Sequence, residues 1–286
     1  MLRAFAFGKD LWDPSHRFET SWLLPPYALF AVRALMALYW FTVIFFILAW
    51  WCTHPSAGGC AMAGDTFSYF THLTYWGIAF YMLVAAVHTF TYAHRGTPLL
   101  DRLPRPLQAL HSLFYTSVCV FPPIVTVIYW AVLFDGTWFP REFDAWQNLS
   151  QHALNSAAAL FEIVVPRTAP PPVIHLLWLI VLLALYLGLA YVTRATEGFY
   201  TYSFLDPGEN GSGVVAGYIL GIGVGCCVVF GLVYGAIWLR VWVTEKKLGM
   251  DGKFARQPRW RESDAEMAGQ SGAEVTKERS PAVTAF

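Results

Sequence analysis

Long apolar segments separated by short polar ones constrain this chain more than any other feature of it. A helix needs about 20 mainly apolar residues to cross the hydrocarbon core of a bilayer. Six segments reach or approach that length, at residues 27–51, 68–92, 107–134, 147–165, 173–193 and 213–243. Only 13% of the 286 residues are charged, whereas a soluble domain carries about a quarter. We therefore predict an all-α integral membrane bundle of about six transmembrane helices.

These segments divide the chain into three parts. Residues 1–26 form an N-terminal segment, residues 27–243 the transmembrane domain, and residues 244–286 a tail. The tail is polar and poor in aromatic residues, so we predict that it is disordered. The formal net charge is zero, which argues against a nucleic-acid partner.

The basic residues indicate the orientation. They gather in the N-terminal segment, in the second and fourth connections and in the tail, whereas the other connections carry only Arg141 and Arg194. Because basic loops stay on the cytoplasmic side, both termini are predicted to be cytoplasmic. The segment lengths do not distinguish the endoplasmic reticulum from the plasma membrane, and the sequence leaves the oligomeric state open.

Two features of the predicted lumenal side depend on this orientation. Cys52 and Cys60 flank the first connection, and they can form a disulfide if it faces an oxidising compartment. Asn210, Gly211 and Ser212 match a glycosylation acceptor triplet close to the membrane.

Polar groups inside the predicted membrane helices are candidates for a functional site, because burying them in lipid is costly. The second helix opens with Thr71 and His72, and the fourth carries His152 and Asn155 at a similar depth below the lumenal surface. The segment after the fifth helix brings Asp206 to the same side.

A threonine nucleophile is one chemistry that these groups fit. The hydroxyl of Thr71 needs a neighbouring base, and the imidazole of His152 suits that role at neutral pH. Asn155, Thr74 or a backbone amide can donate to an oxyanion. The alternative is that the same groups only cross-link helices through hydrogen bonds. Neither interpretation requires a metal or a cofactor.

The histidines suggest a second chemistry. His72 and His152 are predicted near one leaflet and His111 and His175 near the other, as a transmembrane two-haem electron carrier requires. The simpler interpretation of each is a hydrogen-bonded interfacial residue. Near the cytoplasmic end of the first helix, Arg33 is expected to extend to the interface.

Four motifs carry a resemblance to a known family. In order, they are Tyr69-Phe-Thr71-His-Leu-Thr74, Cys119-Val-Phe-Pro-Pro ending in Tyr129-Trp130, Gln151-His152-Ala-Leu-Asn155-Ser156, and Tyr202-Ser-Phe-Leu-Asp206. Over residues 25–243 the chain resembles the rolling-stone proteins and, more distantly, the androgen-induced and androgen-dependent TFPI-regulating proteins.

The distant branch implies a six-helix threonine hydrolase that cleaves fatty-acid esters of hydroxy fatty acids within the membrane. Its threonine corresponds to Thr71, or to Thr74 if the register slips by three. Its catalytic histidine position falls on Asn155, which cannot act as a base, so His152 or His72 would have to replace it. The rolling-stone branch implies a role in membranes or cell fusion without an established chemistry.

We therefore predict a membrane protein that hydrolyses a lipid ester, with Thr71 as the nucleophile and His152 as the base. Membrane lipids are the expected partners, and one of them would be the substrate. The alternative is a non-enzymatic scaffold, lipid-binding or fusion-related protein. The predicted supporting residues are His72, Thr74, Asn155 and Asp206.

Overall fold

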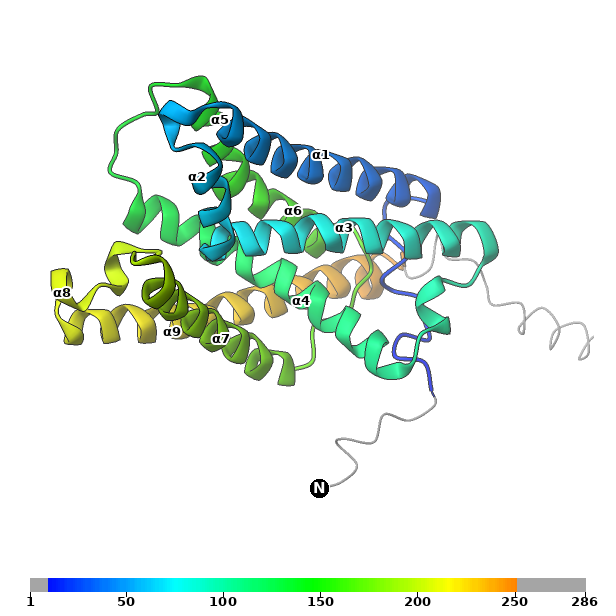
Figure 1. The fold of residues 1–286 in the computed structure, drawn as a ribbon. Coiled ribbons are helices and arrows are strands. Elements are labelled where there is room, and N and C mark those ends of the chain that lie inside the picture. The colour runs from blue at the N-terminus through cyan, green and yellow to red at the C-terminus, as the bar shows by residue number, and fades with distance from the viewer. Residues whose placement is uncertain (1–9, 251–286) are drawn as a thin grey trace, which may run out of the picture.

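A computed structural model describes residues 10–250, which fold into a bundle of helices (Figure 1). Apart from an isolated bridge between Ser21 and Pro166, this part of the chain contains no β-structure. Its α-helices are α1 (Pro26–Thr53), α2 (Gly59–Asp65), α3 (Phe70–Arg95), α4 (Arg105–Ile128), α5 (Glu142–Leu149), α6 (Asn155–Val164), α7 (Ile174–Glu197), α8 (Pro207–Asn210) and α9 (Ser212–Val241).

Shorter turns extend or join these helices. The π-helical turns are η5 (Tyr129–Leu133) after α4, η6 (Ser150–Leu154) between α5 and α6, and η8 (Trp242–Lys247) after α9. The 3-10 turns are η2 (Pro55–Ala57), η3 (Thr66–Ser68), η4 (Leu99–Arg102) and η7 (Ser203–Leu205).

Five of the described helices are long and apolar enough to cross a membrane: α1, α3, α4 with η5, α7, and α9 with η8. To this extent the prediction of an all-α membrane bundle is confirmed. The sixth predicted segment is the helical run α5–η6–α6, residues 142–164. It is not among the five, and its sequence is interrupted by polar residues: Asn148, Gln151, His152, Asn155 and Glu162.

Successive long segments run in opposite directions along the bundle, including the run α5–η6–α6 (Figure 1). The start of α1 and the end of α9 therefore lie at the same end. We name this the basic end, because it carries most of the described Lys and Arg residues. The opposite end consists of residues 54–69, 134–144 and 194–211, and we name it the acidic end.

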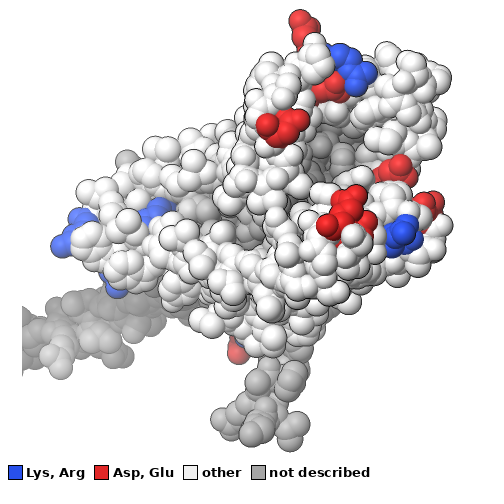
Figure 2. Space-filling model, turned by 90° about the vertical axis from the view of Figure 1, so that its left-hand side faces the viewer, with Lys and Arg blue, Asp and Glu red and all other residues white. Residues whose placement is uncertain are grey.

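Figure 2 shows the acidic end, where Asp and Glu side chains outnumber Lys and Arg. Its acidic residues are Asp65, Asp135, Glu142, Asp144, Glu197, Asp206 and Glu209, and its basic ones are Arg141 and Arg194. Acidic residues therefore predominate at one end of the bundle and basic residues at the other.

The bundle has a buried core and a largely apolar outer surface. α1 packs most extensively against α3, and α4 lies against α3, α6 and α9. Within this core Ile78, Met82 and Cys119 are fully buried. Large apolar side chains also cover the outside of the bundle, where lipid would surround them. The most exposed include Leu35, Leu38, Leu185, Leu220 and Leu232.

The last long helix continues through η8 to Lys247, past the predicted boundary at residue 243. Most of the predicted disordered tail, residues 251–286, lies outside the described residues, as do residues 1–9 of the N-terminal segment.

Arg33 does not extend to the interface, so that prediction is wrong. Its side chain is 1% exposed and forms an ion pair with Glu162 on α6. Burial of the whole guanidinium is possible because Glu162 and further acceptors surround it.

Candidate functional site

A cavity of about 510 Å³ lies among α3, α4, α7 and α9, close to the acidic end. The hydroxyl-bearing residues in its wall are Thr71, Tyr129, Tyr186 and Tyr202. The rest of the wall is mainly aliphatic, and it includes Ile124, Ile128, Ile180, Leu183, Leu187 and Ile219. This volume is typical of a small-molecule site. The lining favours an apolar ligand that has one polar end.

Thr71 lies in the first turn of α3, is 8% exposed, and forms part of the cavity wall. Its side chain is close enough to the phenol of Tyr202, from the segment between α7 and α8, to interact with it. Burial raises the pKa of Tyr202, and the interaction with Thr71 opposes part of that rise. Tyr186 completes the group, with its hydroxyl 3.1 Å from the carbonyl oxygen of Ser68.

His72 interacts with a different helix. Its Nδ1 accepts from the side-chain amide of Gln151 in η6 at 3.4 Å. Consecutive residues on a helix point about 100° apart, so Thr71 can line the cavity while His72 contacts η6.

His152 lies behind Tyr129 as seen from the cavity. The two rings stack with centroids 3.6 Å apart and planes 6° from parallel. Tyr129 lines the cavity and His152 does not. The Nδ1 atom of His152 is buried and has no hydrogen-bond partner. The hydroxyl of Tyr129 donates to Asn148 at 2.7 Å, which fixes the ring against the imidazole.

Asn155 links α6 to α4. Its Oδ1 accepts from the hydroxyl of Thr126 at 3.0 Å, and its Nδ2 lies 3.4 Å from the carbonyl oxygen of Pro122. Ser156 contributes a further contact, 2.6 Å from the same Thr126 hydroxyl. These bonds give Asn155 a clear packing role between two helices.

The other two predicted supporting residues have local roles. The hydroxyl of Thr74 donates to the carbonyl oxygen of Thr71 at 2.9 Å, within α3. Asp206 caps α8 by accepting from the backbone N–H of Gly208 at 2.7 Å. Neither side chain lines the cavity that contains Thr71.

Thr71 and the two predicted histidines thus belong to two groups. Thr71 lies in the cavity wall, whereas His72 and His152 lie in a layer with Gln151, behind Tyr129. Among the described hydrogen bonds, none joins Thr71 to His152. Sequence reasoning missed Tyr129 and Tyr202 as site residues, although both belong to motifs that carry the family resemblance.

The histidines proposed for haem binding have separate neighbours. The ring of His111 packs against Phe18, Tyr81 and His88, with centroids 5.1, 5.7 and 5.2 Å away. His175 instead lies with its Nδ1 2.8 Å from the hydroxyl of Thr116. Within residues 10–250, no group of three or more His, Cys, Asp or Glu side chains is arranged to hold a metal ion.

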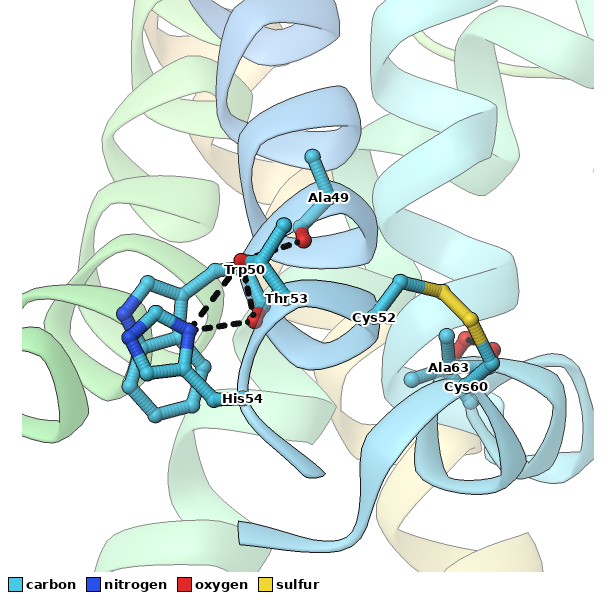
Figure 3. The surroundings of a disulfide bond; sticks show 8 residues. Ala49, Trp50, Cys52, Thr53, His54, Cys60 and Ala63 are labelled. Carbon is cyan, nitrogen blue, oxygen red and sulfur yellow. Dashed lines mark hydrogen bonds between the residues drawn. A yellow bond between two sulfur atoms is a disulfide. The ribbon is translucent and has the colours of Figure 1, made fainter. Parts of the chain in front are cut away.

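Cys52 and Cys60, whose pairing the sequence leaves open, form a disulfide at the acidic end (Figure 3). It joins the last turn of α1 to α2, which leads into the segment before Thr71. Beside it, the ring of His54 folds back over Trp50, with centroids 4.2 Å apart (Figure 3). The segment that precedes Thr71 is therefore linked covalently to α1 through α2.

Comparison of the chain with protein-family models, with curated proteins and with solved structures finds no match. The geometry of the site is accordingly the basis for the functional proposal.

Proposed function

We propose that this chain is an integral membrane protein that binds a lipid, with the acyl chain in the cavity and the polar end at Thr71 and Tyr202. One observation carries the proposal: a largely apolar cavity of about 510 Å³ whose wall brings Thr71 and Tyr202 together. An acyl ester or fatty acid has the matching distribution of apolar and polar surface.

We further infer that the bundle crosses the membrane six times and that the basic end is cytoplasmic. The alternating directions of the six long segments support this count, because they bring both described ends of the chain to one side. The excess of Lys and Arg at that side supports the orientation. A disulfide at the acidic end supports an oxidising compartment there, either the lumen of the endoplasmic reticulum or the cell exterior.

Lipid binding is testable by photo-crosslinking with a palmitic acid analogue that carries a diazirine and an alkyne. Ala184 lines the cavity, so Ala184→Phe should fill part of it and reduce labelling. Ala195, exposed on the same helix and outside the cavity, provides the control Ala195→Phe. Labelling that persists unchanged in Ala184→Phe would exclude this cavity as the binding site.

Hydrolysis of the bound lipid ester is the second candidate, because the Thr71 side chain lies in the cavity wall. In this mechanism the Thr71 oxygen attacks the ester carbonyl carbon and its proton passes to His152. The alcohol leaves with that proton, and water then releases the acyl group from Thr71. The phenol of Tyr202 would donate to the oxyanion. Tyr129 must rotate to let His152 reach Thr71, a closure that an unliganded site need not show.

A fluorophosphonate probe separates hydrolysis from binding alone. A hydrolase should be labelled, and both Thr71→Ala and His152→Ala should abolish labelling while thermal melting shows an intact fold. Lipid crosslinking without fluorophosphonate labelling would indicate a non-enzymatic lipid-binding protein. Absence of both reactions would favour a scaffold or fusion-related role. A Soret band in the purified protein would instead indicate the two-haem carrier.

A further inference from the structure

Three arginines from distant parts of the chain meet at the basic end of the bundle. Arg17 belongs to the N-terminal segment, Arg167 follows α6, and Arg240 lies in the last turn of α9. Glu245 in η8 is the acidic residue among them. We name these four residues the arginine cluster.

The contacts place Glu245 between the arginines. Its Oε1 accepts from Nη2 of Arg17 and lies 3.9 Å from Nε of Arg167. Both Arg17 and Glu245 are close enough to Arg240 to interact with it electrostatically. Among these four residues, three guanidinium groups therefore lie around one carboxylate.

Arg240 is the member with the most unused hydrogen-bonding capacity. Its side chain is 8% exposed, and only its Nη2 has a partner, the carbonyl and hydroxyl of Thr168. Its Nε and Nη1 atoms are buried without a hydrogen-bond partner, as is Nε of Arg17. A buried guanidinium with unmet donors is costly unless an anion meets it.

Within residues 10–250, two acidic residues of the N-terminal segment, Asp13 and Glu19, have partners of their own. Asp13 accepts from the backbone N–H groups of Arg17 and Phe18 and also interacts with the charge of Arg17. Glu19 has Asp13, Arg33 and Asp101 as its charged neighbours. Burial raises the pKa of both Asp13 and Glu19, which favours their neutral forms.

We propose that Arg17, Arg167 and Arg240 form a binding site for a phosphate group, and that Glu245 is the carboxylate which the phosphate displaces. Guanidinium groups bind phosphate oxygens through paired N–H donors. A phosphate monoester carries up to two negative charges and three acceptor oxygens. It can therefore accept from the unpartnered Nε and Nη1 donors of Arg240. This site lies at the opposite end of the bundle from the Thr71 cavity.

Its location favours a lipid source for that phosphate. Basic pockets between transmembrane helices at the cytoplasmic surface bind the head groups of anionic lipids. Beside the cluster, η8 also carries Lys246 and Lys247, and the ammonium of Lys247 lies 5.0 Å from the centre of the Trp242 ring. An interfacial tryptophan and two lysines would hold the helix end at the head-group level.

The test is native mass spectrometry of the full chain in detergent, with phosphatidic acid and phosphatidylcholine of the same acyl chains as probes. We expect tighter binding of phosphatidic acid. Arg240→Gln and Arg167→Gln should each weaken it by about fivefold. Arg102→Gln is the control, since it removes an exposed positive charge at the same end. Glu245→Gln should strengthen binding, because it removes the competing carboxylate and leaves every donor in place.

Equal binding of the two lipids, or equal losses in Arg102→Gln and Arg240→Gln, would overturn the proposal. So would weaker binding in Glu245→Gln, a variant that does not depend on how Arg240→Gln folds. Inorganic phosphate distinguishes the two possible sources. If it displaces phosphatidic acid and raises the melting temperature only when Arg240 is present, the site takes a soluble phosphate. If it does neither, the site is specific for the lipid head group.

Discussion

Arg33 on α1 and Glu162 on α6 form a two-pronged ion pair inside the bundle, with Nε–Oε1 and Nη2–Oε2 distances of 2.8 and 2.7 Å. The remaining Arg33 nitrogen donates to the carbonyl oxygen of Phe18 and to the hydroxyl of Thr89, each at 2.7 Å. The hydroxyl of Tyr81 donates to Glu162 at 3.1 Å. Every charged atom of the pair is therefore met by a partner, and the pair joins three helices to the N-terminal segment.

Removal of one partner of this pair should destabilise the fold strongly. In Glu162→Ala the guanidinium of Arg33 would remain buried without its counter-ion, which costs about 3–5 kcal/mol. Thermal unfolding in detergent measures the loss. Arg102→Ala, at an exposed position, is the control and should melt like the wild type. A melting temperature for Glu162→Ala close to that of the control would show that the pair does not stabilise the bundle.

The helices could be predicted from the sequence because each long apolar segment is a local property of the chain. The run of residues 142–164 was harder to delimit, since its polar side chains interrupt the apolar pattern and a π turn joins its two parts. The partner of Arg33 could not be predicted, because Glu162 is 129 residues away and only the tertiary fold brings the two side chains together.

In the candidate site too, the local sequence predicts some features, whereas others depend on tertiary packing. The sequence identified Thr71 and His152 as polar residues at a similar depth, but not which way each side chain points. A rotation of about 100° between successive residues sends Thr71 to the cavity and His72 to Gln151. Tyr202 comes from an irregular segment, where no periodicity predicts a neighbour. The stacking of Tyr129 on His152 is likewise a contact between separate helical segments that no local pattern predicts.

Glu19 should make stability depend on pH. Its side chain is 1% exposed, and burial, followed by the charge of Asp13, raises its pKa well above the ordinary value of 4.5, although Arg33 opposes the rise. The folded state therefore holds this proton more tightly than the unfolded state. The contribution of this proton to the free energy of unfolding is fully present below pH 4.5. It is lost as the pH rises through the pKa of Glu19 in the folded state.

The measurement is thermal unfolding of the wild type and Glu19→Gln across that range. Glutamine resembles the neutral carboxyl, so Glu19→Gln should lose this part of the pH dependence and melt above the wild type at alkaline pH. Glu209→Gln, at an exposed position of the acidic end, should keep the wild-type profile. Identical pH profiles for wild type and Glu19→Gln would contradict the assignment.

The Cys52–Cys60 disulfide should stabilise the segment that leads to the cavity. It closes a loop with a sequence separation of 8, for which chain entropy predicts about 2–3 kcal/mol. The double variant Cys52→Ser, Cys60→Ser should therefore melt at a lower temperature and should become insensitive to reductant. Cys227→Ser removes the exposed free thiol and should leave melting unchanged. If reductant lowers the melting temperature of the double variant as much as that of the wild type, the effect of reductant does not come from the Cys52–Cys60 disulfide.

The orientation of the bundle can be tested by glycosylation at the acidic end. In the predicted acceptor triplet, the amide of Asn210 already donates to the carbonyl oxygens of Ser203 and Asp206, at 2.8 and 3.1 Å. We expect Asn210 to remain unmodified, because a glycan on that nitrogen would break these bonds. Asp135 is exposed at the same end and precedes Gly136 and Thr137, so Asp135→Asn creates an accessible acceptor.

Expression in eukaryotic cells, followed by endoglycosidase treatment and electrophoresis, gives the result. Asp135→Asn should carry one glycan, whereas the wild type should carry none and should not change mobility when treated. The combined variant Asp135→Asn, Thr137→Ala lacks the acceptor triplet and controls for other effects of the substitution.

A glycan on Asp135→Asn would place the acidic end in the lumen and the arginine cluster in the cytoplasm, beside the anionic leaflet that its proposed ligand requires. An unmodified Asp135→Asn, together with modification of an acceptor triplet introduced at the basic end, would reverse the orientation. In that case the phosphate site would lose its lipid source, while the fold and the cavity at Thr71 would stand.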